Sequence, residues 1–136
     1  MSTIFNKIIK REIPAKIIYE DDDVIAFLDI AQNTKGHTLV IPKESTTSIL
    51  TASEDVVTKV NLVAQKLAID LVKIFDAKGV NILTNANEVA GQTVFHYHVH
   101  VIPRYTEDEL KFKTSNTNFD LDEIYNEILS HIKQTH

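Results

Sequence analysis

The sequence predicts an α+β fold: a mostly antiparallel sheet of five strands that carries one long helix, with short helices at both ends of the chain. Two patterns support this prediction. Apolar residues recur every three or four positions between residues 54 and 77, as in an amphipathic helix packed on a sheet. Residues 93–104 alternate with a period of two, as in a strand with one buried face. The other strands are short runs of β-branched and aromatic residues between turn-forming residues.

Length and composition fit a single domain over residues 1–136. The chain is 43% hydrophobic and 24% charged, and its length allows a substantial core. No apolar run approaches the roughly 18 residues of a membrane span, and no signal peptide is recognisable, so we expect a cytoplasmic protein without membrane contact. The formal charge of −5 argues against binding a nucleic acid polymer, which needs clustered Lys and Arg, but not against a single nucleotide. Without cysteine, disulfides and thiolate metal sites are excluded.

Residues 3–11 are predicted to form a helix that Ser2 or Thr3 caps and that Pro14 ends. Its apolar residues share one face, which alone predicts core packing; they are Ile4, Phe5, Ile8 and Ile9.

A hairpin is expected next. Residues 16–20 and 24–30 form its strands around the acidic turn 20–23, whose carboxylates we expect to be solvated. Asp29 differs from these acids because it ends an apolar strand. After a polar loop, residues 37–42 form a third strand that begins with His37.

The long helix is predicted to begin at a cap on Thr51 or Ser53, with Thr51 and Glu54 fitting a capping box, and to continue to about Ala77. Gly79 is a plausible stop. The residues expected to pack on the sheet are Val56, Val60, Val63, Leu67, Leu71 and Ile74.

Residues 80–85 are predicted to be a fourth strand, and the polar loop 87–91 leads back into the fifth, so these two strands should be antiparallel neighbours. Beyond Arg104, residues 105–136 form a variable tail. It is polar as far as residue 118, and a last helix opens at residues 120–123, with an apolar stripe of Leu121, Ile124, Ile128 and Ile132.

The fifth strand carries the strongest functional signal. Apolar side chains should occupy one face of it, namely Phe95, Tyr97, Val99 and Val101. Three histidines then occupy the other face, with neighbouring Cα atoms about 6.6 Å apart. They are His96, His98 and His100. Three imidazoles in a row suit neither a core nor an ordinary surface, which indicates the floor of a site.

A metal site is an alternative interpretation, since neutral imidazole is a common zinc ligand. His96 and His100 are about 13 Å apart on a strand, so all three rings could meet one ion only if the strand were strongly bent. An adjacent pair of histidines with a distant third ligand stays possible.

The run His-Tyr-His-Val-His-Val-Ile at residues 96–102 matches the signature His-φ-His-φ-His-φ-φ, with φ hydrophobic, of the histidine triad (HIT) superfamily. The amino-terminal half resembles the Hint branch of that superfamily, and the likeness extends over about residues 3–104. The resembling blocks are 4–9, 12–16, 19–22, 26–30, 36–43 and 91–94. The resemblance implies a HIT fold and a homodimer in which the sheet continues across the interface and the long helix contributes to it.

The resemblance implies a role for each histidine. His98 would be the nucleophile, with its Nδ1–H held by a backbone carbonyl at or near His96. His100 would donate to phosphate oxygens as charge builds, while His96 and His37 would support this network, His37 from beneath the triad. Neither a metal nor another cofactor is required.

The resemblance also implies a site for a purine nucleotide. Its base would lie between residues of the first helix and the second strand, which are Ile4, Phe5, Ile8, Phe27 and Ile30. Asp29 would accept the ribose hydroxyls. The α-phosphate or leaving group would be surrounded by Asn85 and by the segment Gly91, Gln92, Thr93 and Val94, whose N–H groups could hold phosphate oxygens.

The expected function is therefore hydrolysis or nucleotidyl transfer at the α-phosphate of purine nucleoside phosphoramidates and acyl-adenylates, through a nucleotidyl-histidine, releasing AMP or GMP. Three alternatives stay open: a Fhit-like dinucleoside polyphosphate hydrolase, which residues 99–104 also resemble, a mainly non-catalytic nucleotide-binding module, and a metal-binding protein.

Asn6 stands where bacterial relatives often have a Cys of a structural zinc site, so we infer no such zinc. The family's tail often reaches the neighbouring subunit's site, so the tail here bears on leaving-group preference.

Overall fold

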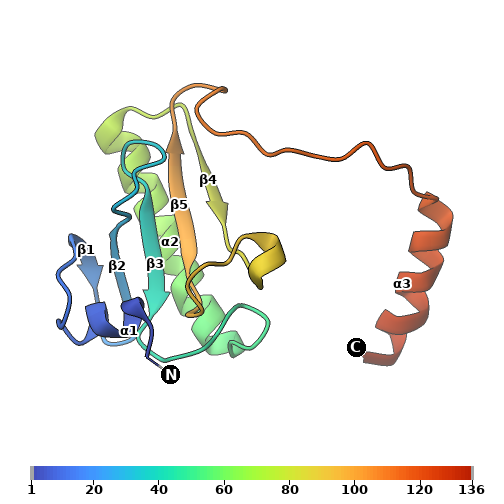
Figure 1. Ribbon diagram of the computed structural model, residues 1–136, viewed down its shortest axis with the longest axis horizontal. Coiled ribbons are helices and arrows are strands. Elements are labelled where there is room, and N and C mark those ends of the chain that lie inside the picture. The colour runs from blue at the N-terminus through green and yellow to red at the C-terminus, as the bar shows by residue number, and fades with distance from the viewer. Residues whose placement is uncertain (1, 136) are drawn as a thin grey trace.

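The computed structural model describes residues 2–135 and confirms the α+β prediction (Figure 1). Its elements are, in chain order, α1 (Ile4–Ile9), β1 (Ile17–Glu20), β2 (Val24–Leu28), β3 (Thr38–Pro42), α2 (Glu54–Phe75), β4 (Gly79–Leu83), the 3-10 turn η1 (Glu88–Ala90), β5 (Val99–Arg104) and α3 (Leu121–Thr135). The strands form one sheet in the order β1-β2-β3-β5-β4. All four pairings are antiparallel, including the expected pairing of β4 with β5.

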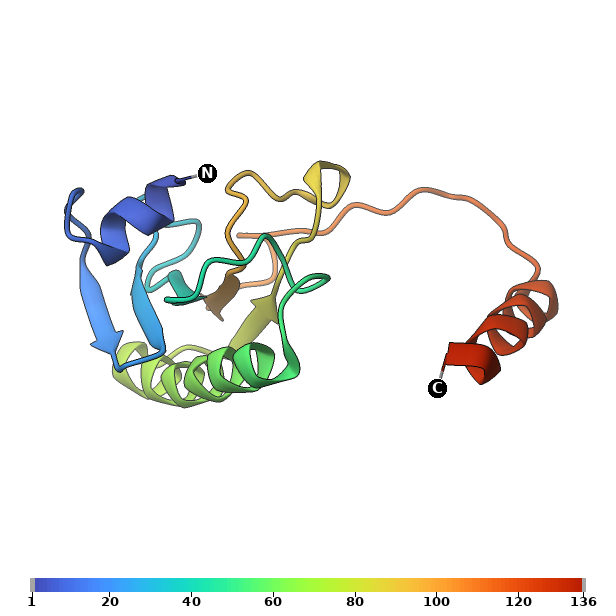
Figure 2. The ribbon, with the colours of Figure 1, turned by 90° about the horizontal axis from the view of Figure 1, so that it is seen from below.

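The two faces of the sheet are covered by different helices, with α1 and α2 on opposite sides (Figure 2). The buried face of α2 packs on one side of the strands, where Val60, Val40 and Val101 are fully buried in one apolar cluster. Phe5 and Ile8 of α1 pack on the other side, against Phe27 and neighbouring strand residues. The smaller cluster under α1 leaves room for a site on this second face.

Strand β5 begins at Val99, later than the sequence pattern predicts, because the ladder with β3 starts at the pair Val40 and Val99. The backbone just before Val99 forms a hydrogen bond outside the sheet: the N–H of Tyr97 donates to the carbonyl of Thr46 at 2.7 Å. The prediction that Phe95 lies in the core is wrong, since this side chain is 47% exposed.

Several predicted boundaries also need correction. Ser53 alone caps α2, by accepting from the N–H of Val56, while the hydroxyl of Thr51 donates to the carbonyl of Ser48. Helix α2 ends at Phe75, followed by Asp76 in the left-handed region, so Gly79 is the first residue of β4 and not a helix stop.

Two further expectations about helix residues are wrong. Ile74, expected in the core, is 68% exposed near the end of α2. Helix α1 ends at Ile9, well before Pro14, and Arg11 has a φ of 64°. Its beginning is as predicted: Thr3 caps it, and Asn6 completes the capping box by accepting from the N–H of Thr3.

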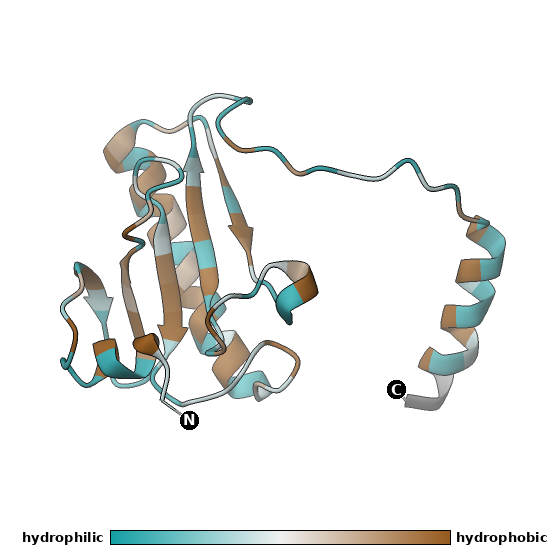
Figure 3. Ribbon diagram, viewed as in Figure 1, coloured by the Kyte–Doolittle hydropathy of each residue, from teal (hydrophilic) through white to brown (hydrophobic). Residues whose placement is uncertain are grey.

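The tail extends away from the sheet and ends in α3, which lies apart from the other elements (Figures 1 and 2). The apolar positions of α3 fall on one side of its ribbon (Figure 3). Its large apolar residues are all at least 38% exposed; they are Leu121, Ile124, Tyr125, Ile128 and Ile132. Among residues 2–135, no helix has the length and apolar character that crossing a membrane requires.

Candidate active site

A hollow of about 330 Å³ lies on the α1 side of the sheet and combines most of the predicted site residues. From the predicted set it contains Ile4, Phe5, Ile8, Phe27, Asp29, Ile30, Thr93, Val94, His98 and His100. Its other walls are Ile13, Pro14, Ala15, Leu28 and Leu39, which sequence reasoning missed. Residues 13–15 could have been found from their position, since they connect the apolar helix α1 directly to the sheet.

Aromatic rings in contact with one another line part of the hollow. The ring of Phe5 meets Phe27 edge to face, with centroids 5.5 Å apart, and meets His98 in the same way at 5.0 Å. This contact places the imidazole of His98 at the end of an apolar slot. A slot with such walls suits a flat apolar group whose polar end reaches the histidines.

The tautomer of His98 follows from a single contact. Its Nδ1 lies 2.6 Å from the backbone carbonyl of His96, and a carbonyl can only accept, so Nδ1 carries the hydrogen. Nε2 therefore keeps its lone pair. The side chain is only 5% exposed, and this burial lowers the pKa of His98, so the ring is neutral at pH 7. The hydroxyl of Thr84, which sequence reasoning missed, donates to the carbonyl of His98 at 2.6 Å and fixes its backbone.

His100 is paired with His37, which lies beneath it as predicted. Nε2 of His37 and Nδ1 of His100 are 3.0 Å apart, and a carboxylate oxygen of Asp29 lies 3.7 Å from the same Nε2. Burial lowers the pKa of both rings, that of His100 to about 4, so the pair shares one hydrogen at neutral pH. The Asp29 carboxylate favours that hydrogen on His37. Nδ1 of His100 then accepts, and its Nε2 is left as a donor.

His96 lies outside the hollow. Its Nε2 donates to the carbonyl of Pro42 at 2.8 Å, so it ties the triad segment to the end of β3. Burial lowers the pKa of His96, and its Nδ1 has no hydrogen-bond partner among the described residues.

A carboxylate and two imidazoles, those of Asp29, His37 and His100, offer three ligand atoms within 4.8 Å of one another. The ring centroids of His37 and His100 are 5.2 Å apart, close to the largest value that a 3.0 Å contact between ring nitrogens allows. The two nitrogens therefore point straight at each other. In tetrahedral coordination, an ion with bonds of about 2.0 Å would hold the two nitrogens about 3.3 Å apart, with both lone pairs aimed at the ion. Here the two nitrogens are 3.0 Å apart and aimed at each other, as in a hydrogen bond.

Besides His37 and His96, three residues predicted to bind the substrate do not line the hollow, namely Asn85, Gly91 and Gln92. Gln92 is 1% exposed, and its amide donates to the carbonyls of Thr47 and Val94 and accepts from the N–H of Asn87. Gln92 thus holds two loops together instead of facing a ligand.

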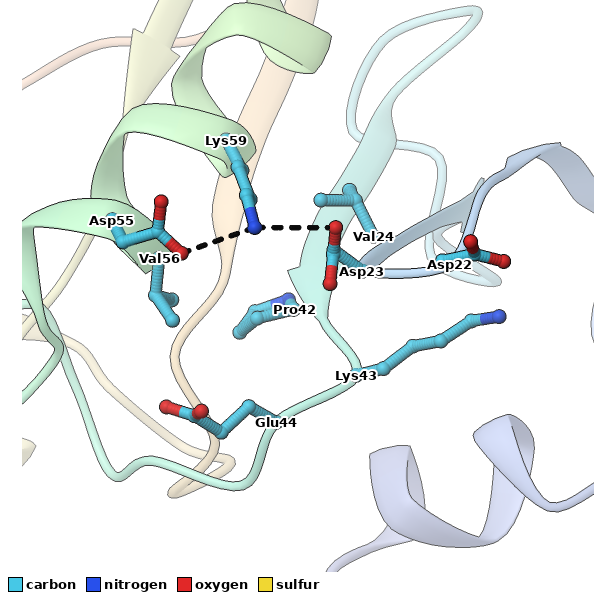
Figure 4. A pocket seen from close by; sticks show the side chains of 9 residues that line it. All are labelled: Asp22, Asp23, Val24, Pro42, Lys43, Glu44, Asp55, Val56 and Lys59. Carbon is cyan, nitrogen blue, oxygen red and sulfur yellow. Dashed lines mark ion pairs between the residues drawn. The ribbon is translucent and has the colours of Figure 1, made fainter.

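A hollow of about 100 Å³ beside the acidic turn is lined by charged residues (Figure 4). Here Nζ of Lys59 on α2 pairs with Asp23 at 3.3 Å and with Asp55 at 3.0 Å. The ion pair with Asp23 connects the hairpin turn to α2, and no triad histidine lines this hollow.

Comparison with known proteins agrees with this geometry. A family model described as the HIT domain matches residues 10–107. The Bacillus subtilis protein named "Protein hit" is 47% identical over 102 residues, which are 75% of this chain and 70% of that protein. A crystal structure of a HIT family protein from Bacillus anthracis has a TM-score of 0.88 and 42% identity, covering 98% of this chain and 96% of that one. A hypothetical histidine triad nucleotide-binding protein from Sulfolobus tokodaii has a TM-score of 0.74 and 34% identity, covering 95% and 87%.

Proposed function

This chain belongs to the HIT family, and from that premise we propose that it hydrolyses, or transfers nucleotidyl groups from, purine nucleoside phosphoramidates and acyl-adenylates, releasing AMP or GMP. The observation that carries the proposal is the tautomer of His98. Its Nδ1–H is held by the His96 carbonyl, which leaves a free Nε2 lone pair at the end of a nucleotide-sized hollow.

The purine base would occupy the apolar part of the hollow, against the wall that contains Phe5 and Phe27. Asp29, where β2 ends, would accept the ribose hydroxyls. The phosphate would then lie before His98, with Thr93 beside it. The neutral donors that would be available to the phosphate are the Nε2–H of His100 and the hydroxyl of Thr93.

In the first step, the Nε2 lone pair of His98 forms a bond to the α-phosphorus. The phosphorus–nitrogen bond to the leaving amine breaks, and that nitrogen keeps the electron pair and takes a proton from solvent. In the second step a water oxygen attacks phosphorus, the bond to His98 breaks and returns its pair to Nε2, and the water proton is released. His100, as the Nε2–H tautomer, would donate to the phosphate oxygens in both steps.

A Fhit-like activity on dinucleoside polyphosphates is the second candidate, since residues 99–104 resemble that branch. The side chain of Arg104 gives this candidate little support. Its Nη2 donates to the backbone carbonyls of Thr106, Glu107 and Leu110, and its Nη1 contacts Asn81, so the guanidinium is engaged outside the hollow.

We also propose a homodimer. The edge strand β4 has one unpaired side among the described strands, where a second copy could continue the sheet. Exposed apolar residues on α2 and α3 offer further contact area; they include Leu62, Ile69, Ile124 and Ile128.

The test is AMP release from an adenosine phosphoramidate and from a diadenosine polyphosphate, measured side by side with wild type and His98→Asn. Phosphoramidate turnover that disappears in the variant supports the proposal. Faster cleavage of the dinucleotide favours the Fhit-like candidate, and AMP binding without turnover of either substrate favours a non-catalytic binding module.

A further inference from the structure

The loop between β2 and β3, residues 29–37, carries one residue of the candidate site at each of its ends. Asp29 follows β2, and His37 precedes β3. The second half of the loop is attached to the end of β5, because the hydroxyl of the buried Thr34 donates to the carbonyl of Pro103 at 2.6 Å. The first half, which begins with Asp29, is held from within the loop.

The side chain of Gln32 connects the two ends of this loop. Its Nε2 lies 2.6 Å from the carbonyl of Asp29 and 2.8 Å from that of His37, and a side-chain amide has two N–H hydrogens, one for each carbonyl. Its Oε1 accepts from the N–H of Gly36 at 2.8 Å. Gln32 is exposed and does not line the hollow, so these contacts are neither core packing nor a binding surface.

The closed loop determines where the Asp29 carboxylate lies. Oδ1 of Asp29 accepts from the N–H of Ala31 at 2.8 Å, and Oδ2 lies 3.7 Å from Nε2 of His37. Ala31 directly precedes Gln32 in the chain, so its N–H is placed by the same closure. Burial lowers the pKa of His37, while the Asp29 carboxylate and the backbone of Ala31 act in the opposite direction. The imidazole therefore senses the position of this half of the loop.

We propose that Gln32 is a positioning residue that holds the Asp29 carboxylate toward the sugar of a bound nucleotide, and so determines the preference for ribose over sugars without hydroxyls. The proposal rests on the proposed function, in which Asp29 accepts the ribose hydroxyls. A carboxylate that is already in place loses little conformational freedom on binding, whereas a loop that must first close loses affinity. The same closure keeps the carboxylate beside the pair formed by His37 and His100.

The test compares the affinities of AMP and 2′,3′-dideoxy-AMP, which lacks both ribose hydroxyls, by titration calorimetry. We expect wild type to favour AMP by at least about tenfold, since hydrogen bonds to a charged acceptor are among the strong ones. Gln32→Met keeps the length of the side chain but removes its amide. It should reduce the preference at least about threefold, by weakening AMP and leaving dideoxy-AMP within about twofold. Gln65→Met, on the exposed side of α2, is the matched control and should keep the wild-type preference.

Gln32→Glu separates the contacts of the side chain. It can still accept from the N–H of Gly36, but it cannot donate to the carbonyls of Asp29 and His37, so it should lose the preference as Gln32→Met does. A wild-type preference in either variant, or an equal weakening of both nucleotides, would overturn the proposal, because a merely structural contact would not distinguish ribose from dideoxyribose.

A second measurement needs no ligand and so separates the role of Gln32 from the proposed function. Proton–nitrogen NMR correlation spectra of the imidazoles report which ring nitrogen carries hydrogen. In wild type at neutral pH, we expect the shared hydrogen on Nε2 of His37, whereas Gln32→Met should also place it on Nδ1 of His100, because the Asp29 carboxylate is no longer held nearby. A wild type that binds neither nucleotide would reject the proposed function. The spectra then decide alone: this shift would keep the positioning role, and unchanged spectra in Gln32→Met would overturn it.

Discussion

Nε2 of His37 lies 3.0 Å from Nδ1 of His100, and the two buried rings share one hydrogen. This contact determines which nitrogen of His100 can donate toward the hollow. His37 does not line the hollow, so it acts on a substrate only through its neighbour.

His37→Leu should therefore lower kcat for phosphoramidate hydrolysis by about 10–100-fold, the usual effect of removing such an orienting partner. AMP affinity should change less than about threefold, because no contact with the hollow is removed. His37→Gln, which can still donate, should recover part of kcat. Steady-state kinetics and AMP titration measure this; an equal loss of affinity and of kcat in both variants would mean that His37 is merely structural.

The pH dependence of activity follows from His98, which must be neutral to attack. Burial lowers the pKa of His98 below its ordinary value of 6.5. We expect kcat/KM to be highest at pH 7 to 8 and to fall at lower pH, with its midpoint below 6.5. A pH profile of phosphoramidate hydrolysis tests this, and a midpoint above 6.5 would show that the ring is not desolvated as described.

The free energy of unfolding should also depend on pH, because burial lowers the pKa of His100 in the folded chain. The pKa of His100 falls from 6.5 to about 4 on folding, so between these values the unfolded chain binds more protons than the folded one. The free energy of unfolding should be constant above about pH 7 and decrease as the pH falls toward 4, with His100 contributing up to about 3 kcal/mol. Urea unfolding from pH 4 to 8 measures this, and His100→Gln should flatten the curve.

Gln92 provides a test of loop positioning. Gln92→Leu keeps the volume but leaves the carbonyls of Thr47 and Val94 and the N–H of Asn87 without their partner. We expect a loss of about 1–3 kcal/mol in the free energy of unfolding. The matched control, Gln65→Leu on the exposed side of α2, should change it by less than about 0.5 kcal/mol. If Gln92→Leu and Gln65→Leu unfold at the same urea concentration, the hydrogen bonds of Gln92 contribute nothing to stability.

The fold was predictable because periodic patterns report burial, whereas most of the candidate site residues were expected from the resemblance to the HIT superfamily. The α2 stripe follows from which face of the helix is buried. The alternation through His96 to Val101 instead separates an apolar face from a face of imidazoles, and both faces are largely buried. Phe95 was misassigned because alternation continues beyond the ladder, and only the bond from Tyr97 to Thr46 shows where pairing with β3 stops. The role of Gln92 depends on a loop 45 residues away, which no local pattern encodes.

Helix α3 gives the sharpest test of the homodimer. A 15-residue helix is marginally stable alone in water, yet this one keeps an exposed apolar stripe away from its own sheet. The likeness to the Bacillus anthracis structure covers 98% of this chain, so it includes most of α3. We expect the stripe to pack on a second copy.

Sedimentation equilibrium should then give twice the chain mass for wild type. Ile128→Glu should weaken the dimer at least about tenfold, because it places a carboxylate in the stripe. Asn126→Glu adds the same charge to α3 but leaves the stripe intact, and it should remain dimeric. A wild-type monomer, or equal weakening by both substitutions, would show that α3 does not hold two copies together. A dimer that stays stable with Ile128→Glu would instead assign the interface to the unpaired edge of β4.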